Sequence, residues 1–317
     1  MTSVSSDIHQ RTLRAFLVYL GGVVVGGALI APWLWHLGQF LIESDIVPQL
    51  APFGFAKYLN RAVLLMVVVG LWPFLRVIGM VDRRSFDLFP NPGWRRDLLL
   101  GCGVALVVIL LCGAIGLTLD YRKWAKGLPR VGSVVAAIAA AMVVSPLEEG
   151  LFRGVLLGSL SRRFKLRLAV AIQAAIFASL HFLKPSAAYK KFAGDVGPWT
   201  GFELLPHFLS GFSQPDKLVA GWLTLFAVGV VLAVAKIRTR SLWLPIGIHA
   251  GWILGLKAIK LGTRKENSPD LFYQIGDVPG GLLALGAVLL TWVLIRSMLG
   301  SQSVTKDDED DGLNTTR

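Results

Sequence analysis

The sequence predicts an all-α polytopic membrane protein with about eight transmembrane helices. Of its 317 residues, 54% are hydrophobic and 16% are charged, whereas soluble domains carry about 25% charged residues. The apolar residues cluster into eight long runs, and a helix needs about 20 such residues to cross a bilayer. Composition and clustering together therefore predict a chain that folds largely within the lipid bilayer.

The predicted spans are separated by connections rich in turn-forming and basic residues. They cover residues 15–41, 62–80, 98–119, 132–160, 168–183, 218–237, 242–259 and 280–299. The first run is too long for the core of a signal peptide and no cleavage site follows it, so we expect it to remain as a span. The fifth run is short, but the flanking Arg167 and Lys184 can extend their charged ends to the interface.

These runs divide the chain into five consecutive segments. We expect a polar tail (1–14), three spans with their loops (15–130), a four-helix core (131–260), a last span (261–300) and a disordered acidic tail (301–317). Within the core, the connection 184–217 is rich in proline, glycine and aromatic residues. Because aromatic side chains favour the membrane interface, we expect this connection to lie along it, with a role in substrate gating.

The net charge of +12 is explained by basic loops that face lipid headgroups, so we expect no nucleic-acid partner. An even number of spans places both termini on one side of the membrane. Assigning each Lys and Arg to its nearest predicted loop gives 17 on that side and 14 on the other. The positive-inside rule then predicts cytoplasmic termini, and we expect a bacterial plasma membrane.

Three charged side chains interrupt the fourth run. Glu148, Glu149 and Arg153 lie between apolar stretches that contain no other charge. An ionised side chain at the centre of a membrane helix costs about 2.5–3.5 kcal/mol even on insertion scales, so such residues usually face a protein interior or a wet cavity. This stretch is therefore a candidate functional site.

A structural alternative exists for the same stretch. Ser145 followed by Glu148 is the pattern of a capping box, with Pro146 at the first helical position. Glu149 and Arg153 are spaced to form an ion pair along one helix face. In this alternative the motif restarts a helix after a break.

Two histidines lie in other predicted spans. His181 is near the end of the fifth run, one helical turn after Phe177, and His249 is in the middle of the seventh. A carboxylate and an imidazole that converge in a dry cavity can deprotonate a water molecule. A second imidazole can donate a hydrogen bond to the oxyanion that forms when this water attacks a carbonyl group.

The same three side chains also suit a metal. Glu148, His181 and His249 together can hold a zinc ion that activates the water. The chain lacks the H-E-x-x-H pattern, the best-known zinc signature. Its two cysteines, Cys102 and Cys112, share one apolar run and have no ligand partners nearby in the sequence. We therefore expect no cofactor, with zinc as the alternative.

Three motifs in this order resemble those of the CAAX protease and bacteriocin-processing family, which includes the Ras-converting prenyl-protein endopeptidases. They are Glu148-Glu149 with Arg153-Gly154, Phe177 with His181, and His249-Ala250. The resemblance covers residues 130–260 and implies a membrane protease with a four-helix catalytic core. It also implies that Glu148 and His181 activate water. Members of the family have often been called metalloproteases, but the glutamate-protease mechanism needs no metal, and we favour this version.

The resemblance further implies that His249 stabilises the oxyanion and that Glu149, Arg153 and Phe177 support the site. The substrate it implies is a peptide or lipidated protein within the bilayer. One position departs from the family pattern: Ile253 stands where an Asn or Asp is usual. Losing one oxyanion donor typically lowers the rate by about 10²–10³-fold.

Two other functions remain open at this point. The Ile253 departure is compatible with a catalytically degenerate relative that acts as a membrane scaffold or immunity protein. Membrane-embedded Glu and His also form proton relays in transporters. A proton-coupled transporter is therefore the third interpretation.

Overall fold

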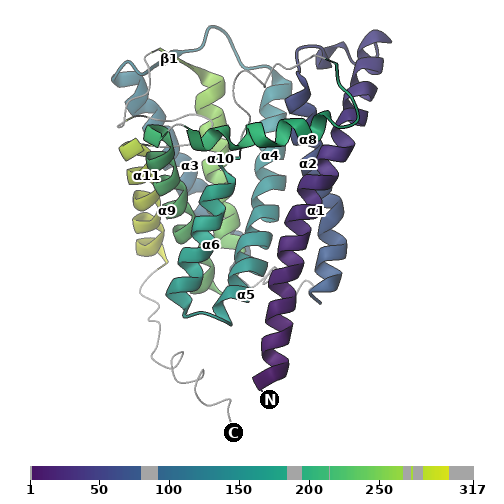
Figure 1. Ribbon diagram of the computed structural model, residues 1–317. Coiled ribbons are helices and arrows are strands. Elements are labelled where there is room, and N and C mark those ends of the chain that lie inside the picture. The colour runs from purple at the N-terminus through teal and green to yellow at the C-terminus, as the bar shows by residue number, and fades with distance from the viewer. Residues whose placement is uncertain are drawn as a thin grey trace.

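The computed structural model describes residues 2–79, 92–183, 195–213, 215–266, 273 and 281–299. Within these residues, seven spans are long and apolar enough to cross a membrane, and Figure 1 shows them as one bundle. They are α1 (Thr2–Glu43), α2 (Phe55–Val77), α3 (Trp94–Thr118), α9 (Pro215–Thr239), α10 (Trp243–Gly262), α11 (Gly281–Met298), and the span formed by α4 (Val131–Glu149), η3 (Gly150–Leu156) and α5 (Leu157–Ser161).

The predicted fifth span is the helix α6 (Leu166–Leu180), which has only 15 residues. Every predicted span is therefore a helix, and the expected all-α polytopic membrane fold is confirmed. The chain is an integral, multi-pass membrane protein. The acidic tail 301–317 lies outside the described residues.

The N-terminal segment is helical. Helix α1 begins at Thr2, whereas the part of it that is apolar enough to cross a membrane begins at Arg14, next to the predicted start of the first span. Extending an existing helix adds one hydrogen bond for each residue fixed, whereas nucleating a helix is costly. The apolar run that starts at Ala15 therefore allows the polar residues before it to become helical.

The span that carries the charged motif is continuous. Helix α4 contains Pro146 in its interior, and Ser145 is fully buried. The capping-box interpretation is therefore wrong. Membrane helices tolerate an internal proline because surrounding groups satisfy the freed backbone carbonyl.

Immediately after Glu149 the backbone widens into the π-helix η3. A π-helical turn inserts extra residues into an α-helix and is frequent at functional sites. The ion pair that the spacing of Glu149 and Arg153 predicts is present across this junction, with Arg153 Nη1 2.8 Å from Glu149 Oε1.

A short two-stranded sheet joins loops that are far apart in the sequence. Strand β1 (Arg122–Trp124) pairs antiparallel with β2 (Thr263–Lys265), so that Arg122 lies opposite Lys265. The Arg122 guanidinium also donates to the Thr263 hydroxyl at 2.5 Å. These contacts tie the end of α10 to the connection that precedes α4. Sequence patterns did not predict the sheet, because each strand has only three residues.

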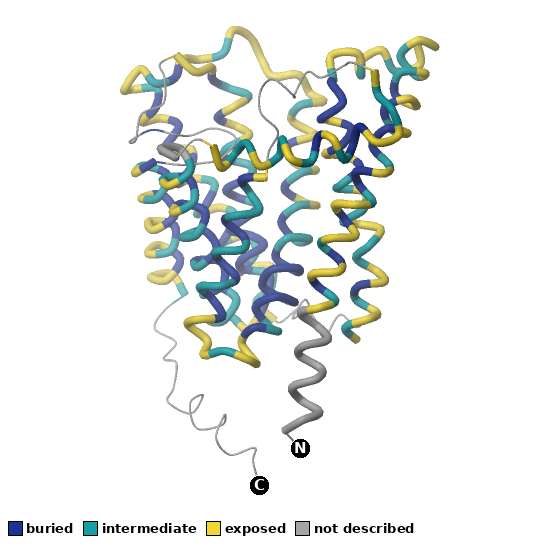
Figure 2. The backbone as a smooth tube through the Cα atoms, viewed as in Figure 1, coloured by how far each residue is buried: buried dark blue, intermediate teal, exposed yellow. Residues whose placement is uncertain are grey.

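Helix α10 packs closely against α3 through glycines. A side chain at Gly247 or Gly251 would collide with the α3 backbone at Leu98 or Cys102. Small residues of this kind let two membrane helices approach closely. The result is that the middle of α10, which carries His249, is buried among other helices (Figure 2).

A segment made of α8 (Thr200–Leu204) and the 3₁₀ helix η4 (Leu205–Ser213) runs across the bundle near the end opposite the termini (Figure 1). Gly201 lies against the Ala28 carbonyl of α1, and Gly211 lies against the Phe182 carbonyl just after α6. The segment thus bridges α1 and α6. It belongs to the connection 184–217 that we expect to lie along the interface, of which residues 184–194 and 214 lie outside the described part.

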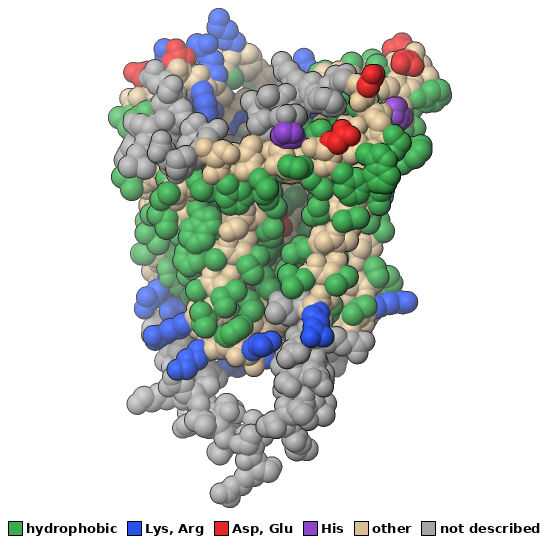
Figure 3. Space-filling model, viewed as in Figure 1, with side chains coloured by type: hydrophobic (Ala, Val, Ile, Leu, Met, Phe, Trp, Pro, Cys, Tyr) green, Lys and Arg blue, Asp and Glu red, His purple; other side chains and the backbone are tan. Residues whose placement is uncertain are grey.

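The outer surface has the distribution of a membrane protein. Figure 3 shows a broad apolar belt with charged side chains at both ends of the bundle. A hollow in this belt, below the crossing segment, reaches an acidic side chain. Exposed apolar side chains such as Val18, Trp33 and Leu111 belong to the lipid-facing surface of the spans.

Candidate active site

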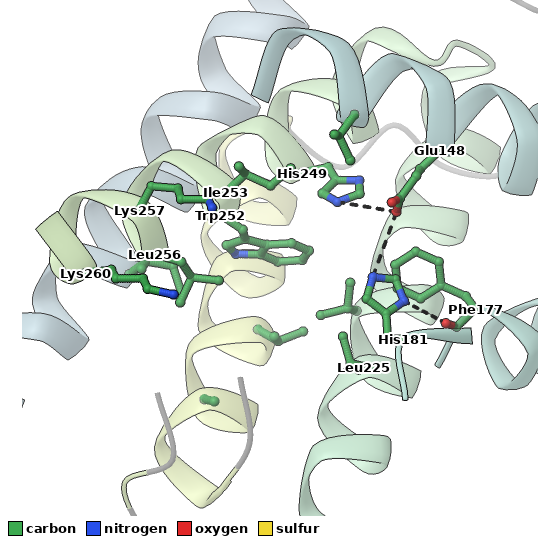
Figure 4. Close-up of a pocket in the computed structure, with 15 residues that line it drawn as sticks. Glu148, Phe177, His181, Leu225, His249, Trp252, Ile253, Leu256, Lys257 and Lys260 are labelled. Carbon is green, nitrogen blue, oxygen red and sulfur yellow. Dashed lines mark hydrogen bonds and ion pairs between the residues drawn. The ribbon is translucent and has the colours of Figure 1, made fainter. Parts of the chain in front are cut away.

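Three side chains from separate helices meet in the interior. Glu148 Oε2 on α4 lies 4.0 Å from Nε2 of His181 and 3.9 Å from Nε2 of His249. His181 directly follows α6, and His249 lies in α10. Figure 4 shows both imidazoles turned toward the same carboxylate. A polar separation near 4 Å leaves room for a bridging water molecule.

The far nitrogen of His181 is held by a backbone group. Its Nδ1 lies 2.8 Å from the Phe177 carbonyl oxygen, one turn earlier in α6. A carbonyl only accepts hydrogen bonds, so Nδ1 carries the proton. In the neutral ring, Nε2 therefore presents a lone pair toward Glu148.

The far nitrogen of His249 is held by a carboxylate. Its Nδ1 lies 2.7 Å from Glu149 Oε1, the same oxygen that accepts from Arg153. Glu149 and Arg153 are both fully buried. A buried carboxylate behind an imidazole fixes its tautomer and stabilises its doubly protonated form. His249 therefore has a more strongly charged setting than His181.

Arg153 is also anchored by its neighbours. Its guanidinium lies 4.5 Å from the centre of the Phe177 ring, which is within range of a cation–π contact. The Gly229 carbonyl on α9 lies 3.5 Å from Nη2. The Phe177 ring in turn contacts the His181 ring in a tilted arrangement, with centroids 4.4 Å apart. The structure thus brings Glu149, Arg153 and Phe177 together behind the three site residues.

The two neighbouring carboxylates at the end of α4 face different surroundings. Glu148 is 24% exposed and borders a cavity, whereas Glu149 faces the protein interior with no exposure. Consecutive residues of a helix do not share a face. One carboxylate is therefore available to a substrate, and the other supports His249.

The site lies at one end of a cavity of about 240 Å³, drawn in Figure 4. Apart from the three site residues and two lysines, its walls are apolar: Ile109, Val144, Phe177, Leu225, Val228, Trp252, Ile253, Leu256, Ala284 and Val288. An apolar pocket with a few convergent polar groups is the usual form of a small-molecule or peptide site.

Position 253 lies on the cavity wall, where Ile253 offers no hydrogen-bond donor. The indole N–H of the neighbouring Trp252 lies 3.4 Å from the Thr291 hydroxyl of α11. Trp252 therefore does not replace the missing donor.

The three site residues are spaced more widely than the ligands of a bound zinc. Donor atoms bound to one tetrahedral zinc lie about 3.4 Å apart, given bonds of about 2.1 Å. The carboxylate-to-imidazole separations here are 3.9 and 4.0 Å. Within the described part of the chain, no group of three His, Cys, Asp or Glu residues is arranged to hold a metal ion.

The structure adds residues that the sequence analysis overlooked. Gly229 contributes a backbone carbonyl, and Lys257 and Lys260 border the far end of the cavity. A backbone carbonyl gives no signal in a sequence. The two lysines do give a signal in the sequence. They follow His249 by 8 and 11 residues, and these intervals return to the same face of a helix.

Comparison with known families gives one match. Residues 130–254 match the family model described as type II CAAX prenyl endopeptidase Rce1-like. The match runs from the start of α4 to just past His249 and confirms the expected resemblance over this segment. The matched family is one of membrane proteases. No curated protein and no solved structure matches the chain.

Proposed function

We propose that this protein, whose core from 130 to 254 is Rce1-like, is an intramembrane endopeptidase for a membrane-associated or lipidated protein. The observation that carries the proposal is the position of Glu148 Oε2, within 3.9–4.0 Å of Nε2 of both His181 and His249. The three groups border one apolar cavity. Together they suit a single water molecule and the carbonyl group that it attacks.

In the proposed reaction, Glu148 and His181 accept a proton from this water as its oxygen attacks the scissile carbonyl carbon. The carbonyl oxygen becomes an oxyanion and receives a hydrogen bond from Nε2–H of His249. When the carbon–nitrogen bond breaks, the proton held by Glu148 and His181 passes to the leaving amine. The second proton of the water stays on the new carboxyl group, so the products are a carboxylic acid and an amine, and proton transfer between them gives a carboxylate and an ammonium group.

The supporting contacts explain why the two histidines take different roles. The Phe177 carbonyl leaves a lone pair on Nε2 of neutral His181, which suits a base. Glu149 stabilises a positive charge on His249, which suits a hydrogen-bond donor. Arg153 donates to the same Glu149 oxygen and pairs with its charge.

The apolar walls suit a substrate that is itself apolar near the scissile bond. The printed family description names prenyl endopeptidases, so a prenylated peptide is a rational first substrate. The lipid can remain in the bilayer while the peptide enters the cavity. We therefore propose prenylated or otherwise lipidated proteins as the natural substrate class.

The decisive experiment uses the full chain in phosphatidylcholine nanodiscs with a farnesylated peptide and its unmodified counterpart. We expect cleavage by the unsubstituted protein and none above background by Glu148→Gln or His181→Ala. Thermal unfolding of both variants serves as the folding control. Full activity in two well-folded variants would refute the assignment.

The Ile253 position favours one second candidate, a catalytically degenerate relative that acts as a scaffold or immunity protein. The two candidates differ in whether Glu148 is needed. In a strain that shows a deletion phenotype, the catalytic proposal predicts no rescue by Glu148→Gln. Rescue by this variant at normal expression would favour the scaffold.

We further propose that both termini are cytoplasmic in a bacterial plasma membrane. On the face drawn in Figure 3, the coloured charged side chains at the end of the bundle that carries the termini are basic, and those at the other end are mixed. The positive-inside rule associates the basic end with the cytoplasm. Labelling of single cysteines at Ser161 and Lys126 with an impermeant reagent on intact cells tests this: Lys126 should react and Ser161 should not.

A further inference from the structure

The far end of the cavity is basic. Lys257 and Lys260 border it, on the same face of α10 as His249. Figure 4 shows both side chains with their nitrogen ends turned back along the helix toward Trp252 and Leu256. Side chains on an α-helix lean toward its N-terminus. The two ammonium groups therefore reach toward the cavity.

The cavity presents three kinds of surface in a fixed order. The carboxylate and two imidazoles lie at one end, apolar side chains follow, and the two lysines lie at the other end. At about 1.5 Å per residue, Lys257 and Lys260 lie roughly 12 and 16 Å from His249 along α10. An extended peptide of about three to five residues covers the same distance.

Further positive charge lies close to the lysine end. Lys57 on α2 lies within electrostatic range of both Arg61 and Lys257. Among the described residues, none of these three forms an ion pair with a carboxylate. Like charges held together in this way repel one another, and a bound anion removes the repulsion.

We propose that Lys257 and Lys260 determine substrate specificity by binding the free C-terminal carboxylate of the peptide fragment that is cleaved off. This inference rests on the proposed endopeptidase function. The scissile bond then lies between Glu148 and His249, and the side chains that follow it contact the apolar wall. The C-terminal carboxylate of the fragment then lies at the ammonium groups of the two lysines.

A peptide suits this order of surfaces better than a phospholipid does. A lipid whose phosphate bound the lysines would place its hydrocarbon chains against Glu148, His181 and His249. That arrangement would remove these polar groups from water without giving them hydrogen-bond partners, which is unfavourable. A peptide supplies amide groups at that end.

The test uses the Glu148→Gln variant in phosphatidylcholine nanodiscs, so that binding is measured without turnover. The probe is a farnesylated, fluorescent peptide made as a free acid and as a C-terminal amide, with three to five residues after the farnesylated cysteine. We expect the acid to bind about tenfold more tightly, a factor equivalent to about 1.4 kcal/mol. Adding Lys257→Met and Lys260→Met should reduce binding of the acid to that of the amide.

Matched variants separate this effect from a general loss of charge or fold. Lys265→Met removes a lysine on β2 outside the cavity and should leave the acid preference unchanged. Replacing Lys257 and Lys260 by Arg keeps both charges and should retain most of the preference. Equal binding of acid and amide to the parent protein overturns the proposal, as does an acid preference that survives the double Met change.

Two further results are informative. If phosphatidylglycerol binding depends on the two lysines while acid and amide bind alike, the lysines hold a lipid phosphate and the proposal is overturned. Cleavage of the peptide is measured separately, with the unsubstituted protein. Cleavage without acid preference overturns the lysine assignment alone, and acid preference without cleavage overturns the endopeptidase function alone.

Discussion

The end of α6 and the middle of α10 each bring one imidazole to the same carboxylate oxygen, yet they do so in opposite surroundings. His181 has a side chain that is 31% exposed, and the Phe177 backbone carbonyl holds its far nitrogen. His249 has a side chain that is 9% exposed, and a fully buried carboxylate and guanidinium lie behind it. One imidazole has a neutral, open setting, whereas the other has a charged, closed one.

This difference teaches how one pair of identical side chains acquires two roles. A carbonyl group fixes the tautomer of an imidazole without favouring its charged form. A carboxylate fixes the tautomer and also stabilises the cation. Four predictions test this distinction, from the largest expected effect to the smallest.

The largest effect on kcat is expected from replacing each histidine by glycine, followed by chemical rescue with free imidazole. His181→Gly should lower kcat by about 10²–10⁴-fold, the usual contribution of a general base. Added free imidazole should restore part of the rate, because the space left by His181 opens to the cavity. His249→Gly should lose about 10²–10³-fold, and imidazole should not restore it because the position is buried. Equal rescue of both variants would contradict the distinction.

The charged setting of His249 depends on Arg153. Arg153→Met leaves the Glu149 carboxylate buried without its cation and should lower the free energy of unfolding by about 3–5 kcal/mol. Lys123→Met is the control, because it breaks the exposed pair with Glu266 and should cost about 0–1 kcal/mol. Denaturant titration in mixed micelles measures both. Similar values for the two variants would show that the buried pair has no special role.

A smaller gain is expected at position 253. Ile253→Asn restores a hydrogen-bond donor one helical turn beyond His249, on the cavity wall. We expect kcat to rise by about tenfold, less than the full 10²–10³-fold value of a built-in donor, because the surrounding helices are not shaped for it. Ile253→Leu is the apolar control and should leave kcat unchanged. A gain in both variants would point to packing instead of hydrogen bonding.

No effect is expected from metal chelation. The distances around Glu148 are longer than those of a zinc site, and the two imidazoles have separate roles in the proposed reaction. Prolonged dialysis against EDTA and 1,10-phenanthroline should leave the cleavage rate within error. If chelation abolishes activity and added zinc restores it, both histidines are zinc ligands, and the proposed difference between their roles is wrong.

Much of the fold follows from hydropathy alone, because each span must be apolar over a length set by the bilayer. Local patterns were less informative where tertiary packing decides the backbone. The pattern at Ser145 and Glu148 is typical of a helix start, yet this stretch lies inside α4, which runs through it without a break. The π-helix after Glu149 and the strands β1 and β2 have no periodic signal that would predict them.

The sequence by itself determined the membrane class, the order of the spans and the ionisable residues within them, since a charge at membrane depth is too costly to occur without a reason. It also indicated that Glu148, His181 and His249 act together. Only the tertiary structure decided how they differ: Glu149 supports His249, a backbone carbonyl supports His181, and two lysines end the cavity. These relations depend on how separate helices are rotated against one another, and close packing of whole helices sets that rotation.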